Sequence, residues 1–217
     1  MTSRRQFGSE ERQVLRLPGP LGLLRLDRPG SAESLLDAMD DSHPEADSLI
    51  PYWADRWPSA EGLLRFLLTI PCPRGPALEI GAGLGITGMG ALRRGWNLQI
   101  SDFHPESLPW LKRNLIANGH SASRAMQLDW RETPPRKWKS ILASDVLYER
   151  VFAPQIADFL DAALEQDGRA IIAEPGRPVA DEAIALLGSR FKMRVHPSRS
   201  RVDQRWHPIR ILDISRL

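Results

Sequence analysis

The chain has 217 residues, of which 42% are apolar and 26% charged, and its formal net charge is only +2. These values are typical of one soluble globular domain and exclude a disordered chain or one drawn to DNA by a strong overall field. The single cysteine, Cys72, excludes an internal disulfide, and neither a signal peptide nor a transmembrane stretch is recognisable. We therefore predict a cytoplasmic protein that binds neither DNA nor a membrane.

The first part of the chain, residues 1–50, is predicted to be an N-terminal extension packed on a domain spanning 51–217. Two apolar runs, 14–17 and 21–26, are joined by a Pro-Gly-Pro turn and indicate a hairpin. Residues 31–39 are predicted to form a short helix.

The segment 51–58 carries two tryptophans and a tyrosine between prolines, so its backbone is expected to be stiff. Trp53 is a candidate wall of a ligand pocket, where an aromatic ring stabilises a cation. Trp57 either lies on the substrate side of that pocket or is a structural anchor. Ser59 is predicted to cap a helix that runs to about Thr69.

The most informative stretch is 77–88, where an apolar run with Glu79 precedes a glycine-rich loop. This pattern predicts a buried strand, a tight turn and a helix start, and the glycines allow the backbone to approach a ligand closely. An acidic residue here repels phosphate but attracts a cation, which favours S-adenosylmethionine (SAM) with its sulfonium and ammonium groups. The candidate cofactor-binding residues are Glu79, Gly81, Ala82, Gly83, Gly85 and Thr87.

Two other interpretations of this stretch stay open. Residues 83–88 also fit the G-x-G-x-x-G pattern of a dinucleotide site, which would indicate an NAD(P)-binding oxidoreductase. That fit requires the strand to continue through Gly81 and Ala82, which are poor strand residues. The remaining interpretation is a plain strand–helix turn.

From residue 77 onward predicted strands and helices alternate, which indicates βαβ units and a mainly parallel sheet. The predicted strands cover 77–81, 97–102, 124–129, 140–145 and 169–174, and the predicted helices cover 86–94, 105–117, 151–166 and 179–188. The last two strands, 191–195 and 209–214, are separated only by a basic, polar loop and predict an antiparallel pair. This α/β layout is similar to the Rossmann-like, seven-stranded class I SAM-dependent methyltransferase fold.

Acidic residues end successive predicted strands, and open α/β sheets bind ligands beyond these carboxyl ends. Asp102 is placed to accept hydrogen bonds from both hydroxyls of a ribose, or alternatively to cap the next helix. Asp129 can accept a hydrogen bond from an adenine amino group and Trp130 can pack on the purine, unless they are a surface acid and a core tryptophan. Phe103 and Ser144 are further candidate cofactor contacts.

The candidate catalytic residues, Asp145 and Tyr148, follow the fourth predicted strand. A carboxylate and a phenol there can hold an incoming amine, although a helix cap with a packed tyrosine is the alternative. The segment lacks the Asn-Pro-Pro-Tyr tetrad of DNA amino-methyltransferases and glutamine methyltransferases, which argues against amide or base-amino substrates. Glu174 and Arg177 either line the substrate mouth or form a plain turn.

Seven basic residues lie between Arg190 and Arg210. They fit an acidic protein surface, a nucleic acid or simply a solvated hairpin. Trp206 is the only tryptophan or tyrosine in this stretch, which favours a protein partner over RNA. The histidines lack metal-ligand spacing, so no metal is predicted.

Together these motifs resemble family 16 of the seven-strand methyltransferases, mostly protein-lysine methyltransferases. The resemblance covers about 48–178 and rests on 51–58, 78–85, Asp102, 111–118, 128–130 and 145–148. Residues 51–58 and 175–178 look most like the lysine methyltransferases of the electron-transfer flavoprotein β-subunit. Glu149 and Arg150 depart from those enzymes, which tend to have another acid there, so the protein substrate stays open.

The resemblance implies SAM as the cofactor, S-adenosylhomocysteine as its product and a lysine of a protein substrate as the methyl acceptor. A small-molecule N-methyltransferase on the same fold is the alternative. The resemblance implies SAM contacts from Trp53, Glu79, Gly81, Asp102, Asp129 and Trp130, and a substrate-side role for Asp145 and Tyr148.

Overall fold

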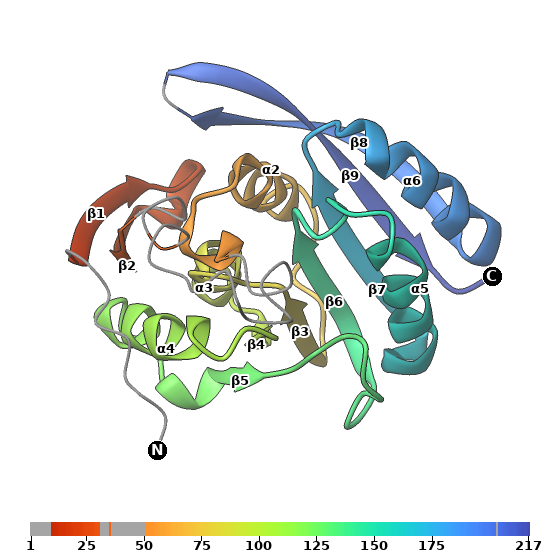
Figure 1. Cartoon of the computed structure of the whole chain (residues 1–217), viewed down its shortest axis with the longest axis horizontal. Coiled ribbons are helices and arrows are strands. Elements are labelled where there is room, and N and C mark those ends of the chain that lie inside the picture. Colours follow the sequence, from red (N-terminus) through yellow and green to blue (C-terminus); the bar gives the residue numbers. More distant parts are fainter. Residues whose placement is uncertain (1–9, 31–34, 36–50, 203) are drawn as a thin grey trace.

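The computed structural model describes residues 10–30, 35, 51–202 and 204–217. These residues form a seven-stranded sheet flanked by helices and a separate two-stranded sheet (Figure 1). The helix predicted over 31–39, apart from Leu35, and the domain boundary predicted at residue 50 lie outside the described residues.

The large sheet has the order β5-β4-β3-β6-β7-β9-β8, and only β9 runs against the other strands. This confirms the predicted mainly parallel sheet with a C-terminal antiparallel pair. The strands are β3 (Pro76–Ile80), β4 (Asn97–Asp102), β5 (Ala125–Gln127), β6 (Trp138–Ser144), β7 (Leu164–Glu174), β8 (Lys192–Val202) and β9 (Arg205–Ser215).

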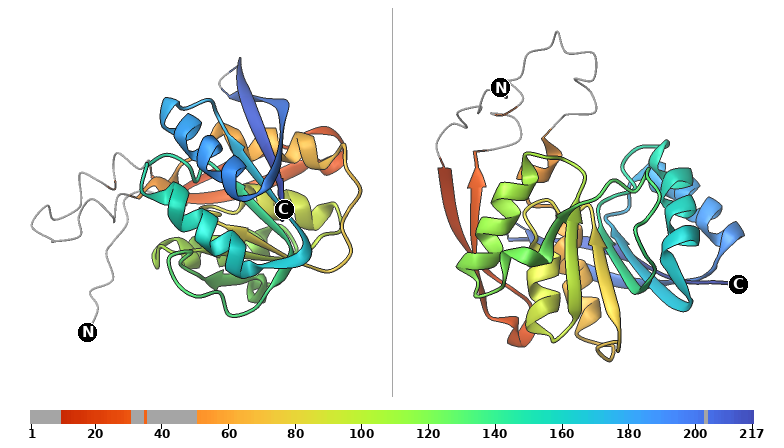
Figure 2. Two further views of the ribbon diagram at one scale, coloured as in Figure 1. Left: turned by 90° about the vertical axis from the view of Figure 1, so that its right-hand side faces the viewer. Right: turned by 90° about the horizontal axis from the view of Figure 1, so that it is seen from below.

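Helices cover both faces of this sheet, because successive strand side chains point to opposite sides. In β6, Leu142 joins the core under α2, α3 and α4, whereas Ile141 and Ala143 join the core under α5 and α6. Figure 2 shows α5 and α6 together on one side. The helices are α2 (Pro58–Leu67), α3 (Ile86–Arg93), α4 (Ser107–Ala117), α5 (Phe152–Ala163) and α6 (Pro178–Arg190), with short 3-10 turns η1 (Gly19–Leu21), η3 (Tyr52–Ala54) and η4 (Ala122–Arg124). None of the described helices has the length and apolar character needed to cross a membrane.

The N-terminal hairpin of β1 (Glu10–Arg16) and β2 (Leu23–Pro29) lies against α4. Two asparagines one turn apart, in α4 and at its C-cap, hold β2 by its backbone: Asn114 Oδ1 accepts from the Asp27 N–H (2.8 Å), and Asn118 Oδ1 accepts from the Arg25 N–H (3.0 Å). Such bonds to main-chain groups fix the position of β2 on the domain.

Several predicted boundaries are wrong, and β7 begins at Leu164 rather than at residue 169. Helix α2 begins at Pro58 with Trp57 as its N-cap residue, so Ser59 lies inside the first turn; proline is favoured at that first helical position. Helix α5 ends at Ala163, because Leu164 already pairs with Trp138 of β6. The basic segment predicted as a loop continues β8 and β9, which pair along their whole length.

Candidate active site

A cavity of about 510 Å³ lies at the carboxyl ends of the central strands. Its size is within the range of small-molecule and cofactor sites. Most of the predicted site residues line it, although they come from five separate segments: Trp53, Trp57, Gly81, Ala82, Gly83, Thr87, Asp102, Phe103, Asp129, Trp130, Ser144, Asp145 and Tyr148. The structure therefore brings these side chains together around one space.

Four predicted site residues are not part of the cavity lining: Glu79, Gly85, Glu174 and Arg177. Lining residues that the sequence analysis missed include Tyr52, His104, Arg131, Phe152 and Gln155. Tyr52, His104 and Arg131 are neighbours in the sequence of predicted site residues, and this proximity could have indicated them. Phe152 and Gln155 belong to the start of α5, which only the tertiary fold brings to the site.

The glycine-rich loop connects β3 to α3. Gly81, Gly83 and Gly85 have φ values of 61°, 52° and 84°, which glycine adopts readily and other residues rarely do. A Cβ on Gly83 would lie 2.9 Å from the backbone carbonyl oxygen of Trp53, so the loop lies directly against η3. Because β3 ends at Ile80, it does not run on through Gly81 and Ala82 as the dinucleotide interpretation requires.

Asp102 links this loop to the end of β4. Its Oδ2 accepts a hydrogen bond from the Gly83 N–H (2.7 Å), and its Oδ1 accepts one from the His104 N–H (2.9 Å). The carboxyl group is buried, which raises its pKa, whereas the two N–H donors act in the opposite direction. Each carboxylate oxygen can accept more than one hydrogen bond, so Asp102 holds the loop and still offers acceptors to a ligand.

Glu79 lies beneath the cavity, packed under α3. Its carboxyl group is 1% exposed, and a Cβ on Gly88 would overlap Glu79 Oε2. Burial raises the pKa of Glu79 to about 8. Burial therefore favours the neutral form of Glu79 in this structure. A bound cation would favour the ionised form, so the role of Glu79 toward a cationic cofactor stays a prediction.

This raised pKa predicts a pH-dependent stability. Folded Glu79 keeps its proton up to about pH 8, whereas the unfolded chain releases it near 4.5. The contribution of the Glu79 carboxyl group to the free energy of unfolding is therefore fully present below pH 4.5 and is lost as the pH rises through about 8. Glu79→Gln mimics the neutral form. Between acidic and mildly alkaline pH, its free energy of unfolding should therefore fall less than that of the wild type, by on the order of a few kcal/mol. Urea titrations at each pH measure this difference.

The matched control is Glu132→Gln, which changes an exposed carboxylate. It should keep the wild-type pH dependence. If Glu79→Gln and wild type lose stability in parallel across this pH range, Glu79 is ionised in the folded protein and the assignment fails.

Aromatic side chains form much of the cavity wall. Trp130 is 4% exposed and meets Phe103 and Phe152 edge-on, with ring centroids 5.8 and 5.5 Å apart. Tyr148 meets Phe152 (4.9 Å) and Tyr52 (5.5 Å) in the same way. Burial raises the pKa of Tyr148, so its hydroxyl group stays protonated and acts as a hydrogen-bond donor or acceptor rather than as a base.

Asp145 occupies a strained position directly after β6. Its φ of 59° lies in the left-handed region, one of only two such non-glycine residues in the described part of the chain. Strained backbone of this kind is concentrated at functional sites. Its side chain is 4% exposed, and Oδ1 accepts hydrogen bonds from the Arg177 Nη2 (3.0 Å) and Nε (3.1 Å).

The other carboxylate oxygen, Asp145 Oδ2, is buried and has no partner of hydrogen-bonding geometry among the described residues. Burial raises the pKa of Asp145, while nearby Ser59 at the start of α2 and Arg177 favour the ionised form. A buried acceptor without a partner is costly, so this oxygen is suited to a donor from a bound molecule.

Arg177 and Glu174 support the site from behind the cavity wall. The Arg177 guanidinium lies between Asp145 and the ring of Trp57, 5.3 Å from the ring centroid. Glu174 is 1% exposed; its Oε2 accepts from the N–H groups of Gly176 (2.7 Å) and Arg177 (3.1 Å), and its Oε1 pairs with Arg210. Glu174 thus shapes the turn that places Arg177 and does not reach the cavity.

Asp129 is engaged by a neighbour two residues along the chain. Arg131 donates to both of its carboxylate oxygens, at 2.8 to 2.9 Å through Nε and 2.5 Å through Nη2. The same guanidinium lies 5.4 Å from the Phe103 ring centroid. Arg131 therefore covers the side of the cavity where the sequence predicted an adenine contact.

Comparison with known proteins agrees with this geometry. A family model described as lysine methyltransferase matches residues 57–185, which include most of the cavity. The chain belongs to this family.

Vertebrate proteins are among the relatives of this lysine methyltransferase family member. The electron transfer flavoprotein beta subunit lysine methyltransferase of Xenopus laevis is 31% identical over 133 residues, covering 58% of this chain and 53% of the relative. The protein of the same name from Rattus norvegicus is 30% identical over 132 residues, covering 59% and 52%. The chain spans about half the length of these relatives.

Solved structures establish the fold of this family member. The ribosomal protein L11 methylase of Lactobacillus delbrueckii subsp. bulgaricus superposes with a TM-score of 0.57 at 18% identity, covering 73% of this chain and 78% of that one. The magnesium protoporphyrin IX methyltransferase of Synechocystis, solved with bound SAM, gives a TM-score of 0.57 at 12% identity, covering 85% and 89%. The predicted class I SAM methyltransferase fold is confirmed.

Proposed function

We propose that this protein transfers the methyl group of SAM to an amine nitrogen, the side chain of a lysine in a protein substrate. The observation that carries this proposal is Asp145. Its buried carboxylate lines the cavity and is fixed by Arg177 through one oxygen. The other oxygen has Ser59 nearby but makes no hydrogen bond of good geometry among the described residues. An amine is the donor that such an acceptor suits, and the surrounding aromatic rings suit the sulfonium cation of SAM.

The chemistry requires a neutral amine. Deprotonating a lysine with a pKa of about 10.4 at pH 7 costs on the order of 4–5 kcal/mol. Burial in a cavity lined by Tyr52, Trp57 and Tyr148 disfavours the charged amine and lowers its pKa. Asp145 then accepts an N–H and aligns the nitrogen lone pair, a positioning role that needs no dedicated base.

The remaining lining residues fit the cofactor. SAM, when bound, supplies an electrophilic methyl group on a sulfonium. We propose that Asp102 accepts from its ribose hydroxyls, that the glycine-rich loop gives its backbone close approach, and that Trp130 and Asp129 face the adenine. Trp53 and Thr87 line the same space, as do Ala82, Phe103 and Ser144. The vertebrate relatives support a protein lysine as acceptor, since each is a lysine methyltransferase of another protein.

Ligand-dependent thermal stability tests the cofactor. A ligand that binds only the folded state adds about 2.7 kcal/mol of stability at a hundredfold excess over its Kd. We expect SAM and S-adenosylhomocysteine to raise the melting temperature by several degrees, and NAD and NADP to leave it unchanged. A shift with NAD or NADP alone would establish the oxidoreductase interpretation instead.

Labelling tests the acceptor. With radiolabelled SAM and a protein extract, label should appear in protein and, after acid hydrolysis, in methylated lysine. Label recovered only in small molecules would support a small-molecule N-methyltransferase.

A further inference from the structure

The outer ends of β8 and β9 form an arm that leaves the sheet. Strand β7 pairs with β9 only as far as Glu174, opposite Arg210, whereas β8 and β9 continue to pair up to Val202 and Arg205. We define the arm as residues 198–202 and 205–209. At a rise of about 3.3 Å per residue it extends roughly 16 Å beyond β7, and Figure 1 shows it projecting past α2.

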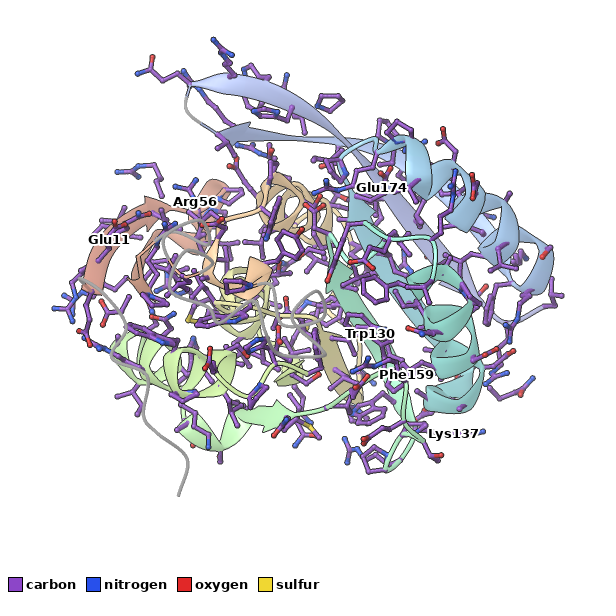
Figure 3. All side chains as sticks on the ribbon, viewed as in Figure 1. Glu11, Arg56, Trp130, Lys137, Phe159 and Glu174 are labelled. Carbon is purple, nitrogen blue, oxygen red and sulfur yellow. The ribbon has the colours of Figure 1, made fainter. Side chains whose placement is uncertain are left out.

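The arm projects from the edge of the sheet that carries the cavity. Glu174 is the last residue of β7, and the arm begins beside it (Figure 3). A chain of contacts joins the two: Arg210, at the base of the arm, donates to the Arg177 carbonyl (3.5 Å), and Arg177 holds Asp145. A molecule that contacts both the arm and the cavity would therefore lie across one continuous surface.

One face of the arm is fixed on α2. The Ser198 hydroxyl donates to the Gly62 carbonyl (2.7 Å), and Ser200 is completely buried. Ile209 packs so closely on Gly62 that a Cβ there would lie 2.6 Å from its side chain. These contacts hold the arm in one position, so it presents its other face as a rigid surface.

The outward side of the arm concentrates positive charge. Arg199, Arg201 and Arg205 are exposed, and the part of the chain that the structure describes gives none of them an acidic ion-pair partner. Arg199 and Arg201 surround the half-exposed Trp206, with guanidinium carbons 4.3 and 5.9 Å from its ring centroid. An exposed cluster of like charges attracts a negatively charged partner.

We propose that the arm docks the acidic surface of the protein substrate and so places the target lysine at Asp145. This inference rests on the proposed function and names the substrate class: a lysine next to a patch of aspartate and glutamate. Guanidinium groups bind carboxylates through paired hydrogen bonds, which fits this role. Nucleic acid is disfavoured because Arg199 already covers the Trp206 ring that would stack on a base, and the net charge is only +2.

Binding of defined probes tests the arm. The probes are a fluorescent peptide with one lysine flanked by aspartates, the same peptide with serines, and a single-stranded RNA of equal charge. Wild type should bind the acidic peptide about tenfold more tightly than the serine peptide at low ionic strength. The triple variant Arg199→Glu, Arg201→Glu and Arg205→Glu should lose this preference, and the Arg→Gln triple variant should lose most of it.

The matched control changes three exposed cations elsewhere: Arg74→Glu, Lys112→Glu and Lys137→Glu. Figure 3 shows Lys137 at the opposite end of the molecule from Glu174. This variant carries the same charge change and should keep the peptide preference. Equal binding of both peptides by wild type, an unchanged preference in both arm variants, or tighter binding of RNA through the same arginines would overturn the proposal.

Methyl transfer to the same peptides separates the two proposals. If the acidic peptide binds through the arm but receives no label from SAM, docking stands and lysine methylation fails. If wild type and arm variants label both peptides at equal rates, methylation stands and docking fails. The expected result is a lower KM for the acidic peptide that depends on the arm, with kcat unchanged.

Discussion

Asp145→Ala is expected to lose nearly all methyl transfer, with kcat reduced by about a hundred- to a thousandfold, while SAM still binds. The carboxylate is the buried acceptor that would hold the amine, and loss of one positioned group in such a site costs about 10²–10³ in rate. Single-turnover measurements with labelled SAM give the rate, and calorimetric titration with S-adenosylhomocysteine gives the affinity.

Asp145→Asn is the matched variant. Asparagine tolerates the left-handed backbone at φ 59° and keeps the shape of the side chain, but it cannot form a charged pair with Arg177. It should fold as wild type does and still lose most of the activity. Full activity in either variant would remove Asp145 from the catalytic site, and loss of cofactor affinity in both would assign it to SAM binding.

Asp102→Ala is expected to weaken the binding of SAM and S-adenosylhomocysteine by about 30- to 100-fold. The variant loses a charge-assisted acceptor for the ribose and also the hydrogen bond that fixes the Gly83 N–H, and such interactions are worth about 1.5–3 kcal/mol. Calorimetric titration measures the change, and we expect the melting temperature without ligand to fall as well.

Asp102→Asn separates the two contributions. Its amide oxygen can still accept from the Gly83 N–H, so stability should recover more than affinity does. Wild-type affinity in the asparagine variant would mean that the carboxylate makes no charge-dependent contact with the cofactor. Asp102 would then serve only to hold the glycine-rich loop.

The sequence by itself determined the order of the elements and most of the cavity. Alternating apolar segments predicted βαβ units, and the acids at the strand ends were predictable as a group because parallel strands end at one edge. The placement of three aspartates around one cavity could therefore be predicted without the coordinates: Asp102, Asp129 and Asp145. The tight glycine-rich loop could be predicted as well, because its backbone has positive φ values that glycine adopts readily.

Only the tertiary structure decided that the pKa of Glu79 is raised, because the shift comes mainly from burial and not from its neighbours in the chain. The pairing of Arg177 with Asp145 joins residues 32 positions apart, and Phe152 reaches the cavity only through the packing of α5. The sequence predicts a loop for the arm because this segment has no alternating apolar face. Polar contacts with α2, such as that of Ser198 with Gly62, hold the arm instead. Hydrophobic periodicity cannot report contacts of that kind, since they depend on which surface the strand meets.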